Sequence, residues 1–367
     1  MSRPACRRSP RLEHLESREV LTAGGLSALQ QQTLELVNMA RTNPAAMADW
    51  VASHLTSNEQ QTLNYYGVNL QAKLNSIRSA TPQPPLAWNN LLAQAAQGHS
   101  EDMVQNNFQG HTGSDGSSPD QRVKATGYSQ AVPSKENAYA YASSVNDAME
   151  AFMLDWGVSS DGHFNNLMQP GVSPDQANRE VGIGIVQTGK TGAGAIVMTQ
   201  DFDSPTNAKP ELLGVAYNDD GSHAYEPGEG RGDVTITAVN KQSGASTSVQ
   251  TWDQGGYQMA LDPGKYNVTA SVNGKVIDSR TVTIGNDNVE VDYNVTELMQ
   301  SPNTIQSPVP NPTQNPGAGS NQIVIAPQFL VQQQDLNQNQ LLGSTSTVSN
   351  LQAVSQSLGL SVSPFSH

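Results

Sequence analysis

The stretch EVGIGIVQTGKTGAGAIVMTQDF, residues 180–202, decides the fold class of the first half of this chain. Its two ends, EVGIGIVQT (180–188) and AGAIVMTQDF (193–202), are rich in valine and isoleucine, and such runs favour β-strands. The GKTG segment between them has the glycine-rich composition of a turn. The stretch therefore predicts an antiparallel hairpin.

The segments before this hairpin have the periodicity of helices. In LSALQQQTLELVNMARTNPAAMADWV (26–51), apolar residues recur at three- and four-residue steps, and Asn43 is placed to cap a second helix that opens at Pro44. Further helices are expected over 88–107 and 145–156. Helices layered on a small antiparallel sheet give an α+β domain, which we expect to span residues 26–204.

The pattern changes to short strands after this domain. Six segments between 211 and 295, among them DVTITAV, YNVTASV and KVIDSRTVTI, are separated by turns rich in Gly, Asp and Asn. This spacing predicts a small antiparallel β-sandwich over 211–295. Residues 296–367 are rich in Gln, Asn, Ser and Pro and contain no Lys or Arg, so we expect a disordered low-complexity tail.

The first 25 residues are basic and lack the apolar middle region of an ordinary secretory signal. Their SPRLEHLESREVLT segment resembles the short leaders of many exported proteins from planctomycete-like bacteria. That resemblance implies export to the extracellular space or the cell surface. A disordered basic segment at 1–25 is the alternative.

Composition excludes several classes of protein. A net charge of −14 over 367 residues disfavours binding to nucleic-acid backbones, and it suits an exported protein. No apolar run reaches the 18–20 residues or so of a membrane-spanning helix. Cys6 is the only cysteine, so no disulfide can form within the chain.

Three segments supply titratable side chains in the order histidine, acid, acid, histidine. His111 lies in GHTGSDGSSP, Glu136 in KENAYAY, and Asp155 and His163 in AFMLDWGVSSDGHFNNLM. Imidazoles with carboxylates are the usual ligands of zinc and other divalent ions, and they also form acid–base pairs. The wide spacing leaves structural roles open, including a solvated loop, a helix cap and a solvated helix face.

The order of these motifs carries a resemblance to a known family. HSEDMVQNNFQGHTGSDGSSPDQRVKATGY, ENAYAY, GHFNNLM, EVGIGI and MTQDF follow one another as in the CAP superfamily, the cysteine-rich secretory protein, antigen 5 and pathogenesis-related 1 proteins, in its SCP-like extracellular branch. The resemblance covers about residues 29–203. It implies a three-layer α-β-α sandwich with a cleft formed by His111, Glu136, Asp155 and His163.

The resemblance also implies a divalent cation such as zinc in that cleft. Two departures affect this expectation: Lys135 stands where the family has glycine, which puts a positive charge beside Glu136, and Asp155 stands where the family has a longer Glu. His99, in HSEDM, matches a helix position that we interpret as structural. Asn165 and Asn166 follow His163 and are expected to make local hydrogen bonds.

Three functions follow from these residues. The leading hypothesis is an exported protein whose His–acid cleft binds a divalent cation or a small ligand, with a lipid or a cell-envelope component as a further partner class. The second is a metal-dependent hydrolase of peptides or cell-envelope polymers. It would need metal-activated water, because Ser117 and Ser118 lie in a turn and Cys6 lies in the N-terminal segment. The third is a structural surface or matrix component. The oligomeric state is left open.

A second cation site is expected in the β-sandwich. The segment YNDDGSHAYEPGEG (217–230) spaces oxygen donors somewhat like a calcium loop, although His223 replaces the usual glycine. The proposed ligands are Asn218, Asp220, Ser222, Glu226 and Glu229. Residues 214–294 resemble SdrD-like B domains, which are calcium-associated β-sandwiches; a plain acidic turn is the alternative. The nearby triplet Arg231-Gly232-Asp233 is interpreted as turn chemistry rather than as an adhesion motif.

Overall fold

A computed structural model describes residues 25–173, 176–222 and 224–300, all within one compact unit of the chain. The expected leader, apart from Gly25, and the tail beyond residue 300 lie outside these described residues. Two main hydrophobic clusters occupy the described part, one built almost wholly from residues 26–202 and the other from residues 212–298.

The N-terminal region contains helices and a four-stranded sheet. Its helices are α1 Ala28–Thr42, α2 Pro44–His54, α3 Ser57–Tyr65, α4 Leu70–Arg78, α5 Asn90–Asn106, α6 Pro119–Ala125, α7 Val145–Leu154 and α8 Gly162–Met168. Its strands are β1 Ala87–Trp88, β2 Lys135–Ala142, β3 Glu180–Gln187 and β4 Ile196–Asp203. The predicted helices over 26–51, 88–107 and 145–156 and the predicted hairpin are confirmed.

Local sequence explains where the first helices begin. Ser27 caps α1 in a capping box with Gln30. Asn43 accepts a hydrogen bond from the backbone of Ala46, and Pro44 occupies the first turn of α2, as predicted.

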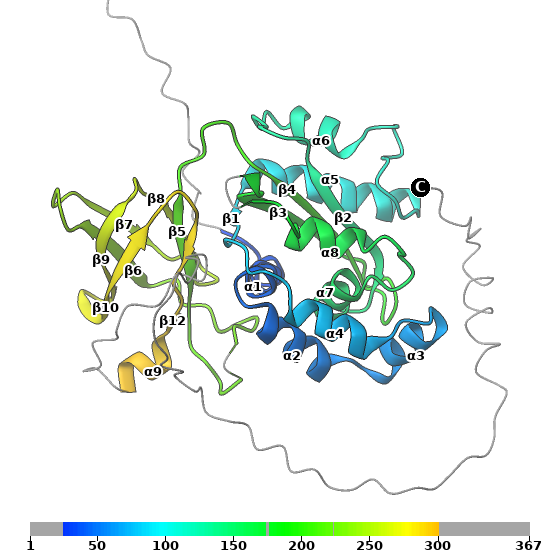
Figure 1. Ribbon diagram of the computed structural model, residues 1–367, viewed down its shortest axis with the longest axis horizontal. Coiled ribbons are helices and arrows are strands. Elements are labelled where there is room, and N and C mark those ends of the chain that lie inside the picture. Colours follow the sequence, from blue (N-terminus) through cyan, green and yellow to red (C-terminus); the bar gives the residue numbers. More distant parts are fainter. Residues whose placement is uncertain (1–24, 174–175, 223, 301–367) are drawn as a thin grey trace, which may run out of the picture. The chain divides into compact units, whose positions relative to one another are not determined.

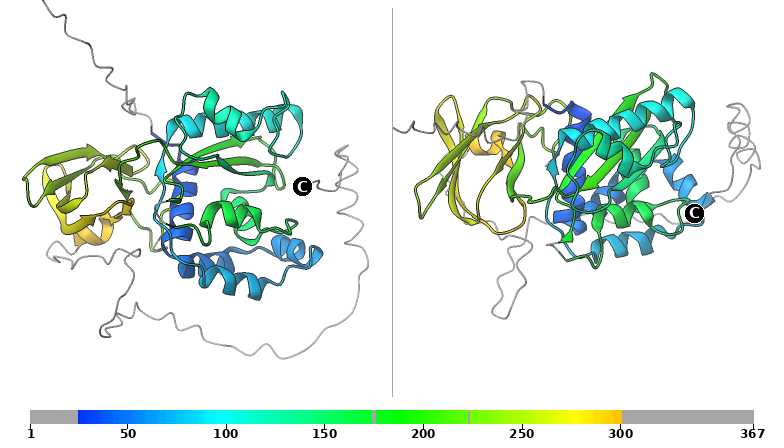
Figure 2. Two further views of the ribbon diagram at one scale, coloured as in Figure 1. Left: turned by 45° about the horizontal axis from the view of Figure 1, so that its top comes forward. Right: turned by 90° about the horizontal axis from the view of Figure 1, so that it is seen from above.

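The sheet separates two layers of helices (Figures 1 and 2). Its strand order is β1-β3-β4-β2; β1 runs parallel to β3, and the other pairs are antiparallel. Helix α5 packs on β3 and β4 on one side, with α6 against it, whereas α1, α7 and α8 contact the sheet on the other side. This is the α-β-α sandwich that the resemblance implied.

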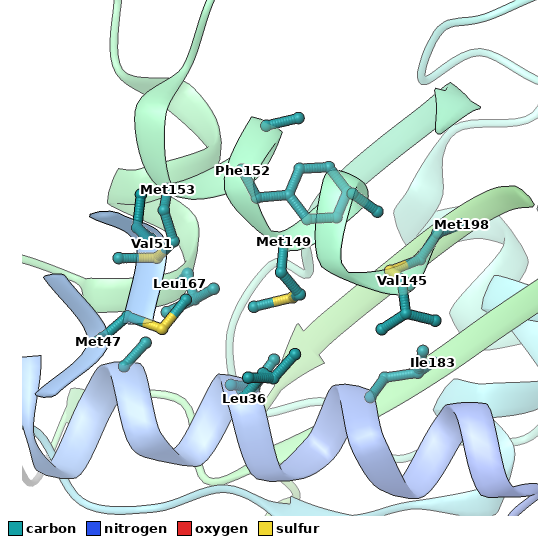
Figure 3. Packing of buried hydrophobic residues seen from close by; sticks show 14 of the residues in the cluster. Leu36, Met47, Val51, Val145, Met149, Phe152, Met153, Leu167, Ile183 and Met198 are labelled. Atoms are coloured by element: carbon teal, nitrogen blue, oxygen red, sulfur yellow. The ribbon is translucent and has the colours of Figure 1, made fainter. Parts of the chain in front are cut away.

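The main core fills the space between the sheet and the second helix layer. Figure 3 shows Met149 of α7 above Leu36 of α1, with Phe152 beyond it and the strand residues Met198 and Ile183 to one side. All five side chains are buried. Apolar burial of this kind stabilises a domain by roughly 25 cal/mol per Å², so this layer holds α7 and α8 in place.

Two glycines of β3 let α5 approach the other face of the sheet. A Cβ at Gly182 would lie 2.0 Å from the backbone nitrogen of Ala93, and one at Gly184 would lie 2.2 Å from that of Gln97. Because these neighbours are helix backbone, no side-chain movement could relieve the contact. The Gly-Ile-Gly sequence at 182–184 therefore allows packing on both faces of the sheet: the two glycines face α5, while Ile183 points into the main core.

A carboxyl pair is buried between α3 and α7. Glu150 is 1% exposed and Glu59 is 8% exposed, and neither carboxyl oxygen of Glu150 has a hydrogen-bond partner among the described residues. Burying a carboxylate without a hydrogen bond or a counter-charge disfavours its ionised form. Burial, with Glu59 and Asp147 adding negative charge, raises the pKa of Glu150 to about 9.

This pair predicts a pH dependence of stability. The folded pKa of Glu150 exceeds its ordinary value of 4.5, so the folded state holds a proton that the unfolded state releases as pH rises between 4.5 and about 9. The free energy of unfolding should therefore fall with rising pH over that range, by up to about 1.4 kcal/mol per unit. Glu150→Gln should flatten this slope in urea titrations between pH 5 and 8. Glu101→Gln, on the exposed side of α5, is the control that should leave it unchanged; an unchanged slope in Glu150→Gln would contradict the assignment.

The C-terminal region is a β-sandwich with a short terminal helix. Its elements are β5 Glu211–Tyr217, β6 Val234–Asn240, β7 Ser246–Gln250, β8 Gly256–Ala260, β9 Gly264–Val272, β10 Lys275–Ile284, β11 Val289–Glu290, β12 Tyr293–Asn294 and α9 Val295–Gln300. One sheet, β10-β9-β6-β7, is antiparallel as expected. The other is mixed, because β11 and β12 pair in parallel with β5 while β8 pairs with it antiparallel.

Two details differ from the sequence expectations. Strand β5 was not predicted, and it is the central strand of the mixed sheet. Residues 296–300, assigned to the tail, continue as helix α9, where Leu298 is buried in the second hydrophobic cluster. Within the described ranges, no helix is both long and apolar enough to cross a membrane.

Candidate functional site

The first half of the predicted site is a pair formed by His111 and Glu136. The Nδ1 atom of His111 lies 2.8 Å from Oε1 of Glu136. Glu136 is 4% exposed on β2, whereas the His111 side chain, in the loop between α5 and α6, is 56% exposed. The buried carboxylate therefore orients an accessible imidazole, and Nε2 of that imidazole points away from the carboxylate.

The positive charge next to Glu136 comes from Arg122 rather than from Lys135. Nη2 of Arg122, on α6, lies 2.5 Å from Oε2 of Glu136 and also donates to the carbonyl of His111. Lys135 is exposed, and side chains alternate across a strand, so it faces away from its neighbour Glu136. The expected effect of Lys135 on Glu136 is wrong for that reason. Sequence reasoning missed Arg122, because the PDQRV segment shows only a helix start.

Two further titratable groups lie beside Glu136. Asp201 of β4 stands directly opposite Glu136 in the strand register and is fully buried, and neither of its carboxyl oxygens has another partner in the described structure. Burial, and then the charge of Glu136, raises the pKa of Asp201 well above its usual range. The two carboxyl groups thus lie side by side on neighbouring strands, and Arg122 supplies the nearby positive charge.

His99 is fully buried near the same carboxylate. Its Nε2 lies 2.7 Å from the carbonyl of Gly110 and 3.8 Å from Oε1 of Glu136, and burial lowers its pKa. The neutral ring supports the loop that carries His111, in line with the structural role expected for His99.

The second half of the site is a pair formed by Asp155 and His163. Nδ1 of His163 lies 2.7 Å from Oδ1 of Asp155, which also accepts a bond from the His163 backbone. Oδ2 of Asp155 accepts a bond from the backbone of Phe164. Asp155 is not on the helix itself: it caps the end of α7 with a positive φ of 49°, and this bend aims its carboxylate at the start of α8.

Asparagine side chains tie the helix that carries His163 to the strand that carries Glu136. Asn166 donates to the carbonyl of Glu136 and to the side chain of Asn137. Asn137 in turn donates to the carbonyl of His163. The bonds of Asn166 reach across to another element rather than staying local, whereas Asn165 bonds locally to the carbonyl of Ser160, as expected.

The four predicted residues form two imidazole–carboxylate pairs. Each imidazole contacts its carboxylate through Nδ1. The Nε2 atom of each ring has no hydrogen-bond partner among the described side chains. Both carboxylates are already engaged by protein donors. The described residues give no group of three ligand atoms within 4.8 Å that includes any of the four. The arrangement therefore presents two imidazole nitrogens, with the carboxylates placed behind the rings as a second layer.

The predicted calcium loop has a different arrangement from that expected. Ligand oxygens of Asp219, Asp220 and Glu229 lie within 4.8 Å of one another, and Asp219 was not among the expected ligands. Asn218 accepts a bond from Arg231, and Ser222 donates to the carbonyl of Ala224.

Hydrogen bonds within this turn also occupy the carboxylate of Glu229. Its two oxygens accept bonds from the backbones of Asp220 and Glu226. This is the internal bonding of an acidic turn. In the adjacent Arg231-Gly232-Asp233 triplet, the guanidinium of Arg231 binds both oxygens of Asp233, which suits the turn interpretation.

Residues 71–202 match the model of the cysteine-rich secretory protein family, CAP. The chain thus carries a domain of the CAP superfamily, as the order of motifs indicated.

Two solved structures match parts of the chain. An extracellular protein containing an SCP domain from Bacillus anthracis is 22% identical over 41% of this chain and 44% of its own, with a TM-score of 0.27. A DUF3823 family protein from Bacteroides ovatus is 24% identical over 23% of this chain and 44% of its own, with a TM-score of 0.17. This chain thus spans less than half the length of either structure. No curated protein matches it.

Proposed function

We propose that the CAP domain binds a divalent cation, with zinc as the first candidate, through the Nε2 atoms of His111 and His163. The observation that carries the proposal is the Nδ1 contact of each ring with a carboxylate. A neutral imidazole that donates from Nδ1 has its lone pair on Nε2, the nitrogen that then coordinates a metal. A zinc ion held there would act as a Lewis acid toward a bound ligand.

In this proposal Glu136 and Asp155 orient the ligands instead of binding the metal. Arg122 and the backbone of α8 already occupy these carboxylates. This refines the expectation that both acids coordinate the ion. It also disfavours hydrolysis, because neither carboxylate is left to act as a general base toward a metal-bound water. The proposed activity is therefore binding of a cation and, through it, of a small anionic or carbonyl-containing ligand.

Calorimetry of zinc binding to the full chain tests the proposal. The unmodified chain should bind zinc, and His111→Ala with His163→Ala should remove that binding. Glu136→Gln, which keeps the size of the side chain, should weaken it by about 10- to 100-fold because the ring is then less well oriented. His54→Ala is the control, because His54 lies exposed at the end of α2 and stacks on Trp50. Equal zinc affinity in the double His variant and the unmodified chain would refute the proposal.

We further propose that the protein is exported. The net charge of −14 and the CAP domain support this location, and the extracellular SCP-domain protein from Bacillus anthracis is consistent with it. Fractionation of the producing cells tests it and also bears on the third hypothesis. Recovery from the medium would favour a free binding protein, recovery with the cell surface would favour a surface or matrix component, and recovery from the cytoplasm would contradict export.

A further inference from the structure

Asn166 of α8 joins the two imidazole–carboxylate pairs. Its side-chain amide donates to the carbonyl of Glu136 at 2.9 Å and to Oδ1 of Asn137 at 3.1 Å. Glu136 orients His111, and Asn166 follows His163 in the same short helix. One side chain therefore connects the strand behind the first ring to the helix that carries the second ring.

Strand β2 contacts both halves of the site. It is an edge strand in the sheet order β1-β3-β4-β2, and an edge strand has backbone groups that no neighbouring strand pairs with. Side chains alternate along a strand, so Glu136 extends toward His111 and its loop. Its neighbour Asn137 extends the other way, toward α8 and Gln200. The placement of α8 against this edge therefore decides where the second imidazole lies relative to the first.

Three amide side chains form a continuous series of hydrogen bonds from α8 into the core. Asn166 donates to Asn137, and Nδ2 of Asn137 lies 3.3 Å from Oε1 of Gln200. The same Nδ2 lies 3.2 Å from the carbonyl oxygen of His163. Asn137 and Gln200 are completely buried, so neither amide can exchange these partners for solvent.

The surroundings of Gln200 fix the direction of each bond in this series. Its Nε2 lies 3.2 Å from Sδ of Met149 and 3.7 Å from Sδ of Met198. A thioether sulfur accepts weakly and cannot donate, so the NH₂ group of Gln200 faces the sulfurs and its oxygen faces Asn137. Asn137 then presents its NH₂ group to Gln200 and its oxygen to Asn166. The residue at position 166 must therefore supply a donor.

The neighbouring Asn165 offers a matched comparison. It is exposed, and its amide donates to the carbonyl of Ser160, just before α8 begins. This bond joins α8 to its own preceding loop, whereas the bonds of Asn166 join α8 to β2. The two asparagines share one residue type and one helix, and they differ in the element that each one contacts.

We propose that Asn166 is a positioning residue that sets the place of the His163 ring relative to the His111 ring, so that both imidazoles reach one cation. This inference rests on the proposed zinc function, because it concerns how the two ligands of that site are held. Asn166 acts through Glu136 and Asn137. Both partners present oxygens to it, so a carboxylate at position 166 would meet repulsion where the amide forms two hydrogen bonds.

Zinc calorimetry of Asn166→Asp and Asn165→Asp in the full chain tests the proposal. Both changes keep the size of the side chain and add one negative charge near the site, which by itself favours a cation. Asn166→Asp should nevertheless weaken zinc binding by about 10- to 100-fold, the usual cost of losing a group that supports a metal ligand. Asn165→Asp should bind zinc at least as tightly as the unmodified chain. Asn166→Ala adds no charge, should also weaken binding, and replaces the aspartate variant if that variant does not fold.

Hydrogen exchange without metal tests the attachment of α8 separately. The backbone amides of residues 165–169 should exchange about 10-fold faster in Asn166→Ala than in Asn165→Ala, because α8 opens more readily once its bonds to β2 are lost. Equal exchange in the two variants would contradict the attachment.

The affinities separate this proposal from the zinc site on which it rests. If the unmodified chain binds zinc and the Asn166 variants bind it as tightly as Asn165→Asp, the positioning role is overturned while the zinc site stands. A lower melting temperature in Asn166→Ala with no loss of zinc affinity would show a purely structural role and would overturn the proposal as well. Absence of zinc binding in the unmodified chain would refute the zinc site, and the positioning role with it.

Discussion

Gly184→Ala is expected to lower the free energy of unfolding by about 3 kcal/mol or more, the upper end of what overpacking costs. The added methyl would lie 2.2 Å from the backbone nitrogen of Gln97 and 2.4 Å from the carbonyl oxygen of Ala96. Helix α5 would have to move away from β3. That movement would break the bonds from Ser100 to the carbonyl of Gly184 and from Ile185 to the side chain of Gln97.

Denaturant titration of the purified variant measures this loss, and Gly98→Ala is the matched control. Gly98 lies in α5, the helix that packs against Gly184, and a Cβ at Gly98 would have no other atom within 4 Å. Alanine should therefore stabilise the protein at this position, by about 0.5–1 kcal/mol. Equal effects at the two positions would show that glycine flexibility, and not the close approach of α5, explains the requirement at Gly184.

Arg41→Met is the second change expected to have a large effect. Arg41 is completely buried, and its guanidinium donates to the carbonyls of Pro84, Leu167 and Asn178. Burial lowers its pKa to about 9. Methionine fills similar space but leaves the three carbonyls without this donor, at about 1–3 kcal/mol for each buried group left unpaired. We expect a total loss of at least 3 kcal/mol.

The same change should also affect the proposed zinc site, because Leu167 belongs to α8, the helix that contains His163. Zinc affinity should fall together with stability in Arg41→Met. Arg78→Met is the control: the exposed pair of Arg78 and Asp49 should contribute less than about 1 kcal/mol. A stability loss in Arg41→Met no greater than in Arg78→Met would contradict the clamping role of Arg41.

The parts of the fold that the sequence predicted are those with a local signal. The hairpin followed from its valines and isoleucines, and the start of α2 followed from Asn43 and Pro44. Strand β5 was missed, since its ELLGVAY sequence contains an interior glycine and only one β-branched residue. That glycine is Gly214, and it is required because a Cβ there would clash with Val291 and Asp292, which are distant in the sequence.

The residues of the candidate site were likewise predicted only in part. His111, Glu136, Asp155 and His163 were found through motif order, and the structure places them in two contacting pairs. Which atoms touch could not be predicted, because the contacts depend on strand register and on the αL turn at Asp155. Arg122 and Asp201 were missed for the same reason.

The position of zinc in crystals of the full chain tests the central claim most directly. Anomalous scattering at the zinc edge should show an ion at about 2.0–2.1 Å from Nε2 of His111 and of His163. Glu136 and Asp155 should remain on the Nδ1 side of the rings. An ion bound to these two carboxylates, or no ion at either imidazole, would contradict the claim.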